Sequence, residues 1–410
     1  MIRLVLLLQF HRIGDLFISI QPHSHKTVKT FFLLLLLSTT VFSQPATKPR
    51  ARDLGIPLNG KPGPFNAITD VPGVLVGYKT RIEGNGKWVL GKGPIRTGVT
   101  VVLPTGKTGR TYPAGYFIFN GDGEMTGLPY LHDYGTGFGP VGITNTNSVG
   151  VVRDAIGAWC HQQFSTKKAL DFSFGLPLVG ETWDGLLNDI NGLHIQKEHV
   201  FQALESATSG AVSEGNVGGG TGMVCYGFKG GTGTASRMIR IGNQDYTVGV
   251  LVQANFGRRD DLMMAGVPVG KEVTDLMPVI NEKDGSIIAI VGTDVPLVSS
   301  QLNLVAKRVT LGIARTGTYG TNSSGDIFMA FSTQKATYDA DTKTTTYRSV
   351  DKSSLDAVFK ATVEATEEAI LNALLAAETM EGIDHHKVYG LPHDRLKAVL
   401  KKYNRLNEQK

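Results

Sequence analysis

Runs of apolar, β-branched and aromatic residues between polar turns predict six β-strands along this chain. They occupy residues 73–78, 98–103, 115–120, 246–255, 286–291 and 327–332. Some of these runs, such as residues 287–291, are apolar at every position rather than at alternate positions. A strand that is apolar on both faces has to be covered by a layer on each side. The pattern therefore predicts a sheet in the interior of the fold.

Five other segments carry the spacing of apolar residues that is typical of amphipathic helices. They lie at residues 151–163, 198–207, 299–315, 354–380 and 393–404. In the third of them, Leu302, Val305 and Val309 recur at intervals of three and four residues and form one apolar face. Strand-like and helix-like segments alternate over residues 53–410 without a repeat or an internal linker. We therefore expect an α/β (α+β) fold in one layered domain.

The first 43 residues have the composition of a secretory signal. Lys26 and Lys29 precede the apolar run at residues 31–37, and a mostly small or polar stretch follows it up to Ser43. This order of charge, apolar run and cleavage region is typical of a signal peptide. The alternative is a membrane anchor, although the run is short for a membrane span. We expect residues 1–43 to be removed, and the protein to be secreted or periplasmic without a stable membrane association.

Removal of this segment leaves a chain that is close to neutral. The full chain has a formal charge of +5, and residues 1–43 contain four of its cations and one of its carboxylates. The mature chain therefore carries a charge of +2. No basic run interleaved with aromatic residues occurs in it. Both observations argue against nucleic acid as a partner.

Glycine is the one residue type in clear excess, with 50 glycines among 410 residues. Because glycine allows left-handed backbone and close approach of other groups, this excess indicates tight turns and loops packed around a site. The richest segment, residues 214–222, lacks the Lys-Ser/Thr ending of a phosphate-binding loop. We interpret it as a segment of close backbone packing near a site.

The cysteines and histidines do not form a metal-binding pattern. Cys160 falls in a helical pattern and Cys225 in a strand pattern, so one disulfide and two buried thiols are both open interpretations. His385, His386 and His393 lie between two predicted helices without a fixed ligand spacing. Neither a His-Glu-x-x-His nor a Gly-x-Ser-x-Gly motif occurs. We expect no metal and no other cofactor.

Gly285 and Ser286 stand where the polar run at residues 281–284 meets an apolar strand. A precursor can cut itself before a hydroxyl residue at such a junction and so expose an N-terminal nucleophile. An ordinary turn that enters a buried strand has the same pattern. The local sequence leaves both interpretations open.

Ser324 and Asp326 stand two residues apart before the next apolar strand, on the same side of an extended chain. A serine nucleophile is weak at its ordinary pKa and needs a base or a relay. Ser324 and Asp326 could supply one to Ser286. Taken alone, a Ser-Gly-Asp sequence is also an ordinary turn.

Two further positions suit the binding of a substrate. Asn255 ends a predicted strand and could donate a hydrogen bond to an oxyanion, although a turn asparagine is the structural alternative. Glu181 is followed by Trp183, and an acid beside an aromatic ring suits an ammonium group through charge and cation–π contact.

Six segments, taken together and in this order, resemble one family. They are residues 52–55, 66–71, 120–127, 143–151, 214–223 and 285–294. Over residues 51–400 the chain closely resembles the DmpA-like family, which comprises L-aminopeptidase/D-Ala-esterase-amidases and β-peptidyl aminopeptidases. The resemblance implies a four-layer αββα sandwich of the kind shared with ornithine acetyltransferases. It also implies self-cleavage before Ser286.

The implied cut between Gly285 and Ser286 would give two pieces that stay together. The first is an α fragment of residues 44–285, and the second is a β fragment of residues 286–410. Family members tend to be tetramers of such cleaved protomers. The resemblance therefore implies association of the two fragments and a homo-oligomer, a tetramer of heterodimers.

The resemblance also gives a role to each candidate residue. It implies that Ser286 is the nucleophile, that Ser324 and Asp326 are the second serine and its acidic partner, and that Asn255 is the oxyanion donor. The acid that holds the free amino group of the substrate falls on Glu181.

The aromatic residue near that acid is typically tyrosine in the family, whereas this chain has Trp183, which lacks a phenolic hydroxyl group. The implied function is a self-processing serine aminopeptidase/amidase that releases N-terminal residues from small peptides, amides or esters with a free amino group. The sequence does not choose among L-, D- and β-aminoacyl substrates, so β-peptidyl aminopeptidase specificity is open.

Two other functions compete with hydrolysis. One is acyl transfer between amino-acid donors and acceptors, but the related acetyltransferases use threonine where this chain has Ser286. The other is a binding protein without catalysis, against which the complete set of candidate residues argues.

Overall fold

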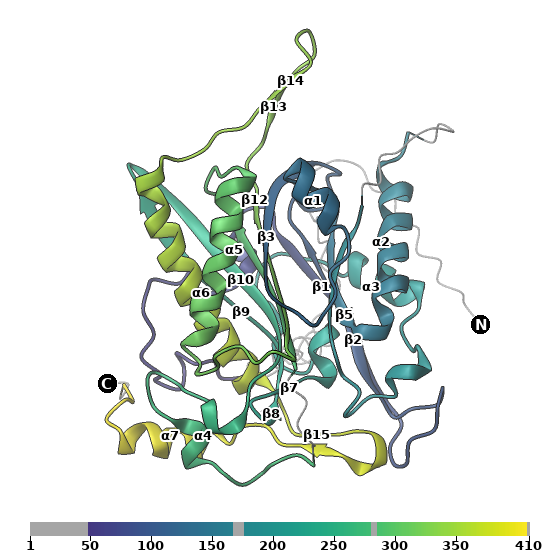
Figure 1. The fold of residues 1–410 in the computed structure, drawn as a ribbon, viewed down its shortest axis with the longest axis vertical. Helices are drawn as coiled ribbons and strands as arrows, with labels where there is room; N and C mark the ends of the chain where they lie inside the picture. The colour runs from purple at the N-terminus through teal and green to yellow at the C-terminus, as the bar shows by residue number, and fades with distance from the viewer. Residues whose placement is uncertain (1–47, 167–175, 280–284, 408–410) are drawn as a thin grey trace, which may run out of the picture. The chain divides into compact units, whose positions relative to one another are not determined.

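Two β-sheets form the centre of the structure in Figure 1, a computed structural model that describes residues 48–166, 176–279 and 285–407. The strand order is β1-β2-β5-β6 in the smaller sheet and β4-β3-β12-β11-β10-β9 in the larger. The smaller sheet consists of β1 (Leu75–Glu83), β2 (Ile95–Leu103), β5 (Val141–Asn145) and β6 (Leu178–Thr182). The larger consists of β4 (Thr136–Phe138), β3 (Thr111–Gly121), β12 (Gly325–Ser332), β11 (Ser286–Thr293), β10 (Gln244–Asn255) and β9 (Gly231–Ile241).

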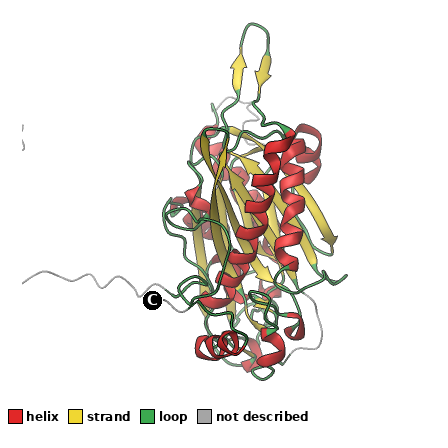
Figure 2. Cartoon of the chain, turned by 90° about the vertical axis from the view of Figure 1, so that its left-hand side faces the viewer, coloured by secondary structure: helices red, strands yellow, loops and turns green. Residues whose placement is uncertain are grey.

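A pair of helices covers the outer face of each sheet. Helices α5 (Ser299–Ala314) and α6 (Leu355–Ala376) pack on the larger sheet, and α2 (Val149–Phe164) and α3 (Lys197–Glu205) pack on the smaller one. Figure 1 shows the two pairs on opposite sides of the sheets, and Figure 2 shows two long helices lying over the face of a sheet. The order helix, sheet, sheet, helix confirms the expected αββα sandwich.

Shorter elements surround these layers. The described residues also form the α-helices α1 (Leu128–Tyr134), α4 (Val269–Glu272) and α7 (His393–Lys402). Two-stranded sheets are formed by β7 (Val224–Cys225) with β8 (Phe228–Lys229), by β13 (Thr337–Asp339) with β14 (Thr344–Thr346), and by β15 (Met380–Glu381) with β16 (Lys387–Val388). Short 3-10 helices lie at Ile68–Asp70, Thr146–Ser148, Ile190–Gly192, Gly218–Gly222, Arg259–Asp261, Lys352–Ser354 and Ile383–His385.

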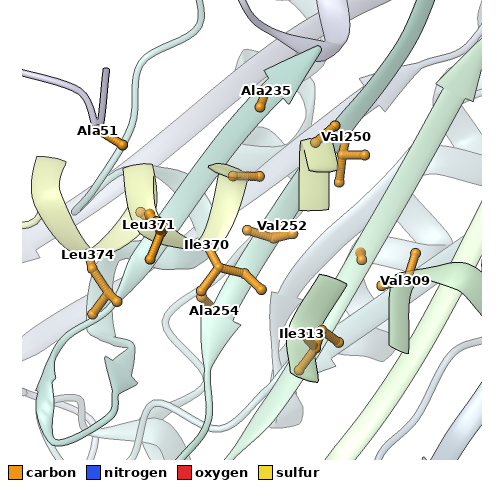
Figure 3. Close-up of a cluster of buried hydrophobic side chains, with 14 of the residues drawn as sticks. Ala51, Ala235, Val250, Val252, Ala254, Val309, Ile313, Ile370, Leu371 and Leu374 are labelled. Carbon is orange, nitrogen blue, oxygen red and sulfur yellow. The ribbon is translucent and has the colours of Figure 1, made fainter. Parts of the chain in front are cut away.

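Alternate residues of β10 and β11 face the two sides of the larger sheet. Val250 and Val252 belong to the core beneath α5 and α6, where Ile370 lies near them (Figure 3). Leu251 and Ile288 belong to a second core between the two sheets. Fully burying an aliphatic side chain of this size stabilises a fold by about 1.5–3 kcal/mol. These apolar strands are therefore held firmly on both faces, and their ends are rigid places for side chains.

The strands and helices expected from the apolar pattern are present, with shifted ends. The helix expected at residues 354–380, for example, ends at Ala376. Within the two large sheets, strands β4, β5, β6 and β9 are not among the expected strands. The first half of β9 is a run of glycine and threonine, because α6 packs so closely here that a Cβ atom on Gly233 would lie 2.0 Å from the carbonyl oxygen of Ala369.

The structure decides between the two interpretations of the cysteines. Cys160 on α2 and Cys225 on β7 are both free and buried. They belong to different cores, one beneath α2 and α3 and the other beneath α5 and α6. Two buried thiols, rather than a disulfide, are therefore present.

The N-terminal signal segment at residues 1–43 and the polar run at residues 281–284 lie outside the described residues. Within residues 48–166, 176–279 and 285–407, no helix is both long enough and apolar enough to cross a membrane.

Candidate active site

The first residue of β11 is Ser286, and two neighbouring strands bring candidate residues beside it. Asn255, the last residue of β10, pairs with Ser286 across the antiparallel ladder. On the other side, β12 runs parallel to β11 and pairs Gly325 with Ser286. Ser324 and Asp326 flank Gly325, so the ladder places both of them next to the start of β11.

Gly285 is packed so tightly before Ser286 that it has no room for a side chain. A Cβ atom at this position would lie 1.4 Å from the carbonyl oxygen of Asn255. The carbonyl oxygen of Gly285 accepts a hydrogen bond of 3.2 Å from the backbone N–H of Gly325. The carbonyl group that precedes Ser286 is therefore both fixed in position and bound to a donor.

Ser324 and Asp326 are joined directly. The Ser324 hydroxyl group donates to Oδ1 of Asp326 at 2.6 Å, and Nδ2 of Asn120 donates to Oδ2 at 3.3 Å. Burial raises the pKa of Asp326 to about 6, although these hydrogen bonds oppose the rise. Asp326 can therefore change its protonation state near neutral pH, which suits a group that handles protons.

Two hydrogen bonds set the orientation of the Asn255 side chain, which is only 4% exposed. Its Oδ1 accepts from the backbone N–H of Val224 at 2.8 Å. Its Nδ2 donates to the carbonyl oxygen of Trp183 at 3.0 Å. Among the described residues, the structure gives Nδ2 this one acceptor, and because an amide nitrogen has two hydrogens, its second N–H can donate to a ligand beside Ser286.

Glu181 comes from β6 of the smaller sheet and is buried. Its Oε1 accepts from the backbone N–H of Glu124 at 3.0 Å, and its Oε2 accepts from the Thr146 hydroxyl group. Burial raises the pKa of Glu181, and the nearby carboxylates of Glu124 and Asp122 add to the effect. A cationic ligand in this place would favour the ionised carboxylate and would itself be bound by it.

Two cavities meet at the Gly285–Ser286 junction. A cavity of about 310 Å³ has Glu181, Trp183, Gly285 and Ser286 in its wall. A second cavity, of about 350 Å³, is bordered by Asn255 and again by Trp183 and Gly285. The structure thus brings the candidate nucleophile, the candidate ammonium anchor and the candidate oxyanion donor to one place.

The sequence profile of peptidase family S58 matches residues 66–388. The chain belongs to peptidase family S58. A β-peptidyl aminopeptidase, BapA, of Sphingosinicella microcystinivorans is 49% identical to it over 88% of this chain and 94% of that protein. A second BapA, of Sphingosinicella xenopeptidilytica, is 44% identical over 90% of this chain and 96% of that protein.

Two solved structures of peptidases resemble this S58 chain in fold. The L-aminopeptidase D-Ala-esterase/amidase of Ochrobactrum anthropi, described as a prototype for the serine aminopeptidases and a variant of the Ntn hydrolase fold, superposes with a TM-score of 0.82. It is 46% identical and covers 88% of this chain and 100% of its own. A β-aminopeptidase of a Burkholderia species superposes with a TM-score of 0.78, at 42% identity over 88% of this chain and 100% of its own. The S58 chain is therefore an aminopeptidase with an Ntn hydrolase fold.

Sequence reasoning did not single out two residues that the structure places in the site. Asn120 binds Asp326, and Thr146 binds Glu181. Both lie inside segments that carried the family resemblance, residues 120–127 and 143–151. Those segments are therefore the feature of the sequence from which the two residues could have been found.

The other sequence candidates lie elsewhere or serve packing. In the glycine-rich segment, a Cβ atom on Gly219 would lie 2.1 Å from Oε1 of Gln253, which confirms close packing. A ring nitrogen of His386 and one of His393 each lie within hydrogen-bonding distance of a backbone carbonyl. No group of three metal-binding side chains occurs among the residues that the structure describes.

Proposed function

We propose that this S58 aminopeptidase is an exported, self-processing serine hydrolase in which Ser286 is the nucleophile. The single observation that carries the proposal is the junction itself. Gly285 is held by close contact with Asn255, and its carbonyl oxygen is bound by Gly325, directly before a hydroxyl residue that lines a cavity.

In the first reaction Ser286 acts on its own chain. Its Oγ attacks the carbonyl carbon of Gly285, the bond to the Ser286 nitrogen breaks, and the hydroxyl proton passes to that nitrogen, so that an ester replaces the peptide bond. The N–H of Gly325 stabilises the negative charge on the Gly285 oxygen. Water then hydrolyses the ester, which leaves residues 44–285 and residues 286–410 as separate pieces with a free amine on Ser286.

In the second reaction the freed Ser286 acts on a substrate. The ammonium group of the substrate binds Glu181, which places the first amide or ester carbonyl at Ser286 Oγ. Asn255 stabilises the oxyanion through Nδ2, and Ser324 with Asp326 relays or stabilises charge during attack. The leaving group takes the proton that the Ser286 hydroxyl group has lost, and water then releases the acyl group as an acid and restores the free serine.

For the substrate, we propose small peptides, amides or esters with a free amino group, with β-aminoacyl residues as the preferred N-terminal residues. The names of both Sphingosinicella relatives support β-aminoacyl groups. The Ochrobactrum enzyme, at 46% identity, supports α-L-aminoacyl and D-alanyl substrates as the second candidate class. A panel of β-, α-L- and α-D-aminoacyl p-nitroanilides, compared by kcat/KM, decides between them.

Export and assembly are further parts of the proposal. Residues 1–43 have the order of a signal peptide, which supports a secreted or periplasmic location. The two fragments contribute strands β10 and β11 to the same sheet, which supports their staying together after the cut. We also propose a homo-oligomer of cleaved protomers.

Electrophoresis of the purified protein under denaturing conditions tests the central claim. The expected result is two fragments, with N-terminal sequences that begin near residue 44 and at Ser286. Ser286→Ala should give one uncut and inactive chain. Full activity in a chain that stays whole would overturn the proposal.

A further inference from the structure

Lys229, the last residue of β8, is fully buried. It has no role in the self-cleavage or the substrate reaction proposed for Ser286. Its ammonium group donates to the carbonyl oxygens of Met223 and Gly230, each at 2.8 Å, and to that of Gly220 at 3.4 Å. Burial lowers the pKa of Lys229 to about 7, and the nearby acidic groups of Cys225 and Asp184 oppose this fall. A charge is costly to bury unless its hydrogen bonds are satisfied, and these three acceptors match the three donors of an ammonium group.

The important acceptor is Met223, because its carbonyl belongs to the same peptide group as the N–H of Val224. The carbonyl end of this peptide accepts from Lys229 Nζ at 2.8 Å and from the N–H of Gly230 at 2.9 Å. The N–H end donates to Oδ1 of Asn255 at 2.8 Å. Hydrogen bonds in such a chain polarise one another, so a cation on the carbonyl strengthens the N–H as a donor.

The orientation of the Asn255 amide depends on this N–H together with the carbonyl oxygen of Trp183, which accepts from Nδ2. Oxygen and nitrogen ends of an amide are similar in size, so a half-turn of the side chain exchanges an acceptor for donors. With Oδ1 held by Val224, Nδ2 faces Trp183 and the cavity that Asn255 and Gly285 border. An amide turned the other way would present an oxygen to the oxyanion and would repel it.

We propose that Lys229 is a positioning residue that acts on the reaction through Asn255. Its ammonium group holds and polarises the Met223–Val224 peptide, and this peptide holds the Asn255 amide with its donor end toward the reacting carbonyl. The inference rests on the role proposed above for Asn255. The competing explanation is that Lys229 only stabilises the backbone around β7 and β8.

A double-mutant cycle separates the two explanations. Lys229→Met keeps the length of the side chain and removes the charge, and we expect it to lower kcat by about 10- to 100-fold, as misplacement of a catalytic group does. KM should change little, because Glu181 still binds the substrate. Asn255→Ala should lower kcat by about 10²- to 10³-fold. The double variant should be no slower than Asn255→Ala alone, because the two residues act through one amide.

Two further variants support this test. Lys229→Gln retains a donor for the Met223 carbonyl without the charge, so its kcat should lie between those of the wild type and Lys229→Met. It also replaces Lys229→Met in the cycle if that variant fails to fold. Val309→Ala, in the core under α5 and away from the site, should lower the melting temperature and leave kcat unchanged. For a variant that is cut incompletely, kcat is calculated from the concentration of the cut form.

Two results would overturn the proposal. One is a multiplicative loss of kcat in the double variant, which would show that Lys229 acts independently of Asn255. The other is a fall in melting temperature with unchanged kcat in Lys229→Met, which would show a structural role alone. Unchanged kcat in Asn255→Ala would instead overturn the role of Asn255, and the inference with it.

Discussion

Asn255 and Ser286 face each other in register at the ends of two antiparallel strands, β10 and β11. The parallel strand β12 lies on the other side of β11 and adds Ser324 and Asp326 at the same edge of the sheet. Glu181 comes from β6 of the other sheet. The site is therefore built where the ends of two stacked sheets meet, and both sheets are held by cores on either face.

The contact between Gly285 and Asn255 gives the first prediction. In Gly285→Ala the new methyl group would meet the Asn255 carbonyl oxygen at 1.4 Å, so the start of β11 has to move. Because misplacing reacting groups by about 1 Å can cost roughly 10²-fold in rate, self-cleavage should slow by that order. The measurement is the time course of fragment appearance on denaturing gels.

Gly150→Ala is the matched control for this substitution. A Cβ atom there meets nothing within 4 Å, and the residue lies in helix α2. This variant should cleave at the normal rate and should be at least as stable as the unsubstituted protein, because alanine leaves the unfolded chain less conformational freedom than glycine does. Normal cleavage in Gly285→Ala as well would show that the tight junction is not needed for the reaction.

The two cysteines give a prediction about thiol reactivity. Cys160 and Cys225 are buried and free, and burial raises the pKa of each thiol to about 12. Because only the thiolate reacts, a thiol reagent such as DTNB should label neither residue in the native protein and both after unfolding. A count of zero thiols in the unfolded, unreduced protein would indicate a disulfide and contradict the structure.

The apolar pattern located the start of β11 and the end of β10, because a boundary between polar and apolar residues marks the end of a buried strand. It did not show that β12 lies parallel beside β11, since strand pairing depends on the whole fold. The bond between Asn120 and Asp326 joins residues 206 positions apart. No local pattern encodes such a contact, so the grouping of the site residues came from the family resemblance.

The raised pKa of Asp326 predicts how stability depends on pH. Its pKa in the fold is about 6, above the ordinary value of 3.8, so the fold favours the protonated form. The stabilisation from Asp326 is therefore complete below pH 3.8 and is lost as the pH rises through 6. The side chain of Asp326→Asn cannot become charged. Its free energy of unfolding should therefore rise relative to that of the protein with Asp326 as the pH goes from 3.8 to 6, by up to about 3 kcal/mol.

The experiment compares free energies of unfolding from pH 4 to pH 8 in a Ser286→Ala background, which we expect to stay uncut, so that cleavage does not vary. Ser324→Ala, measured in the same background, provides a second test of the pKa of Asp326. The Ser324 hydroxyl bond lowers the pKa of Asp326, so its removal should shift the transition to higher pH. If the free energy of unfolding of Asp326→Asn differed from that of the protein with Asp326 by the same amount at every pH, the prediction would be contradicted.

The role proposed for Glu181 leads to a prediction about the binding of substrates with a free amino group. Glu181→Gln removes the charge while keeping the shape and an acceptor for the Glu124 N–H. A hydrogen bond to a charged group contributes about 1.5–3 kcal/mol, so KM for an aminoacyl amide should rise by about 10- to 100-fold with a smaller change in kcat. Glu124→Gln is the control, because the exposed Glu124 borders the same cavity, and its carboxylate acts on Glu181 only through its charge while its backbone N–H makes the hydrogen bond. It should leave KM almost unchanged. An equal rise of KM in both variants would mean that the cavity attracts cations through its overall charge, and that Glu181 is not the specific anchor.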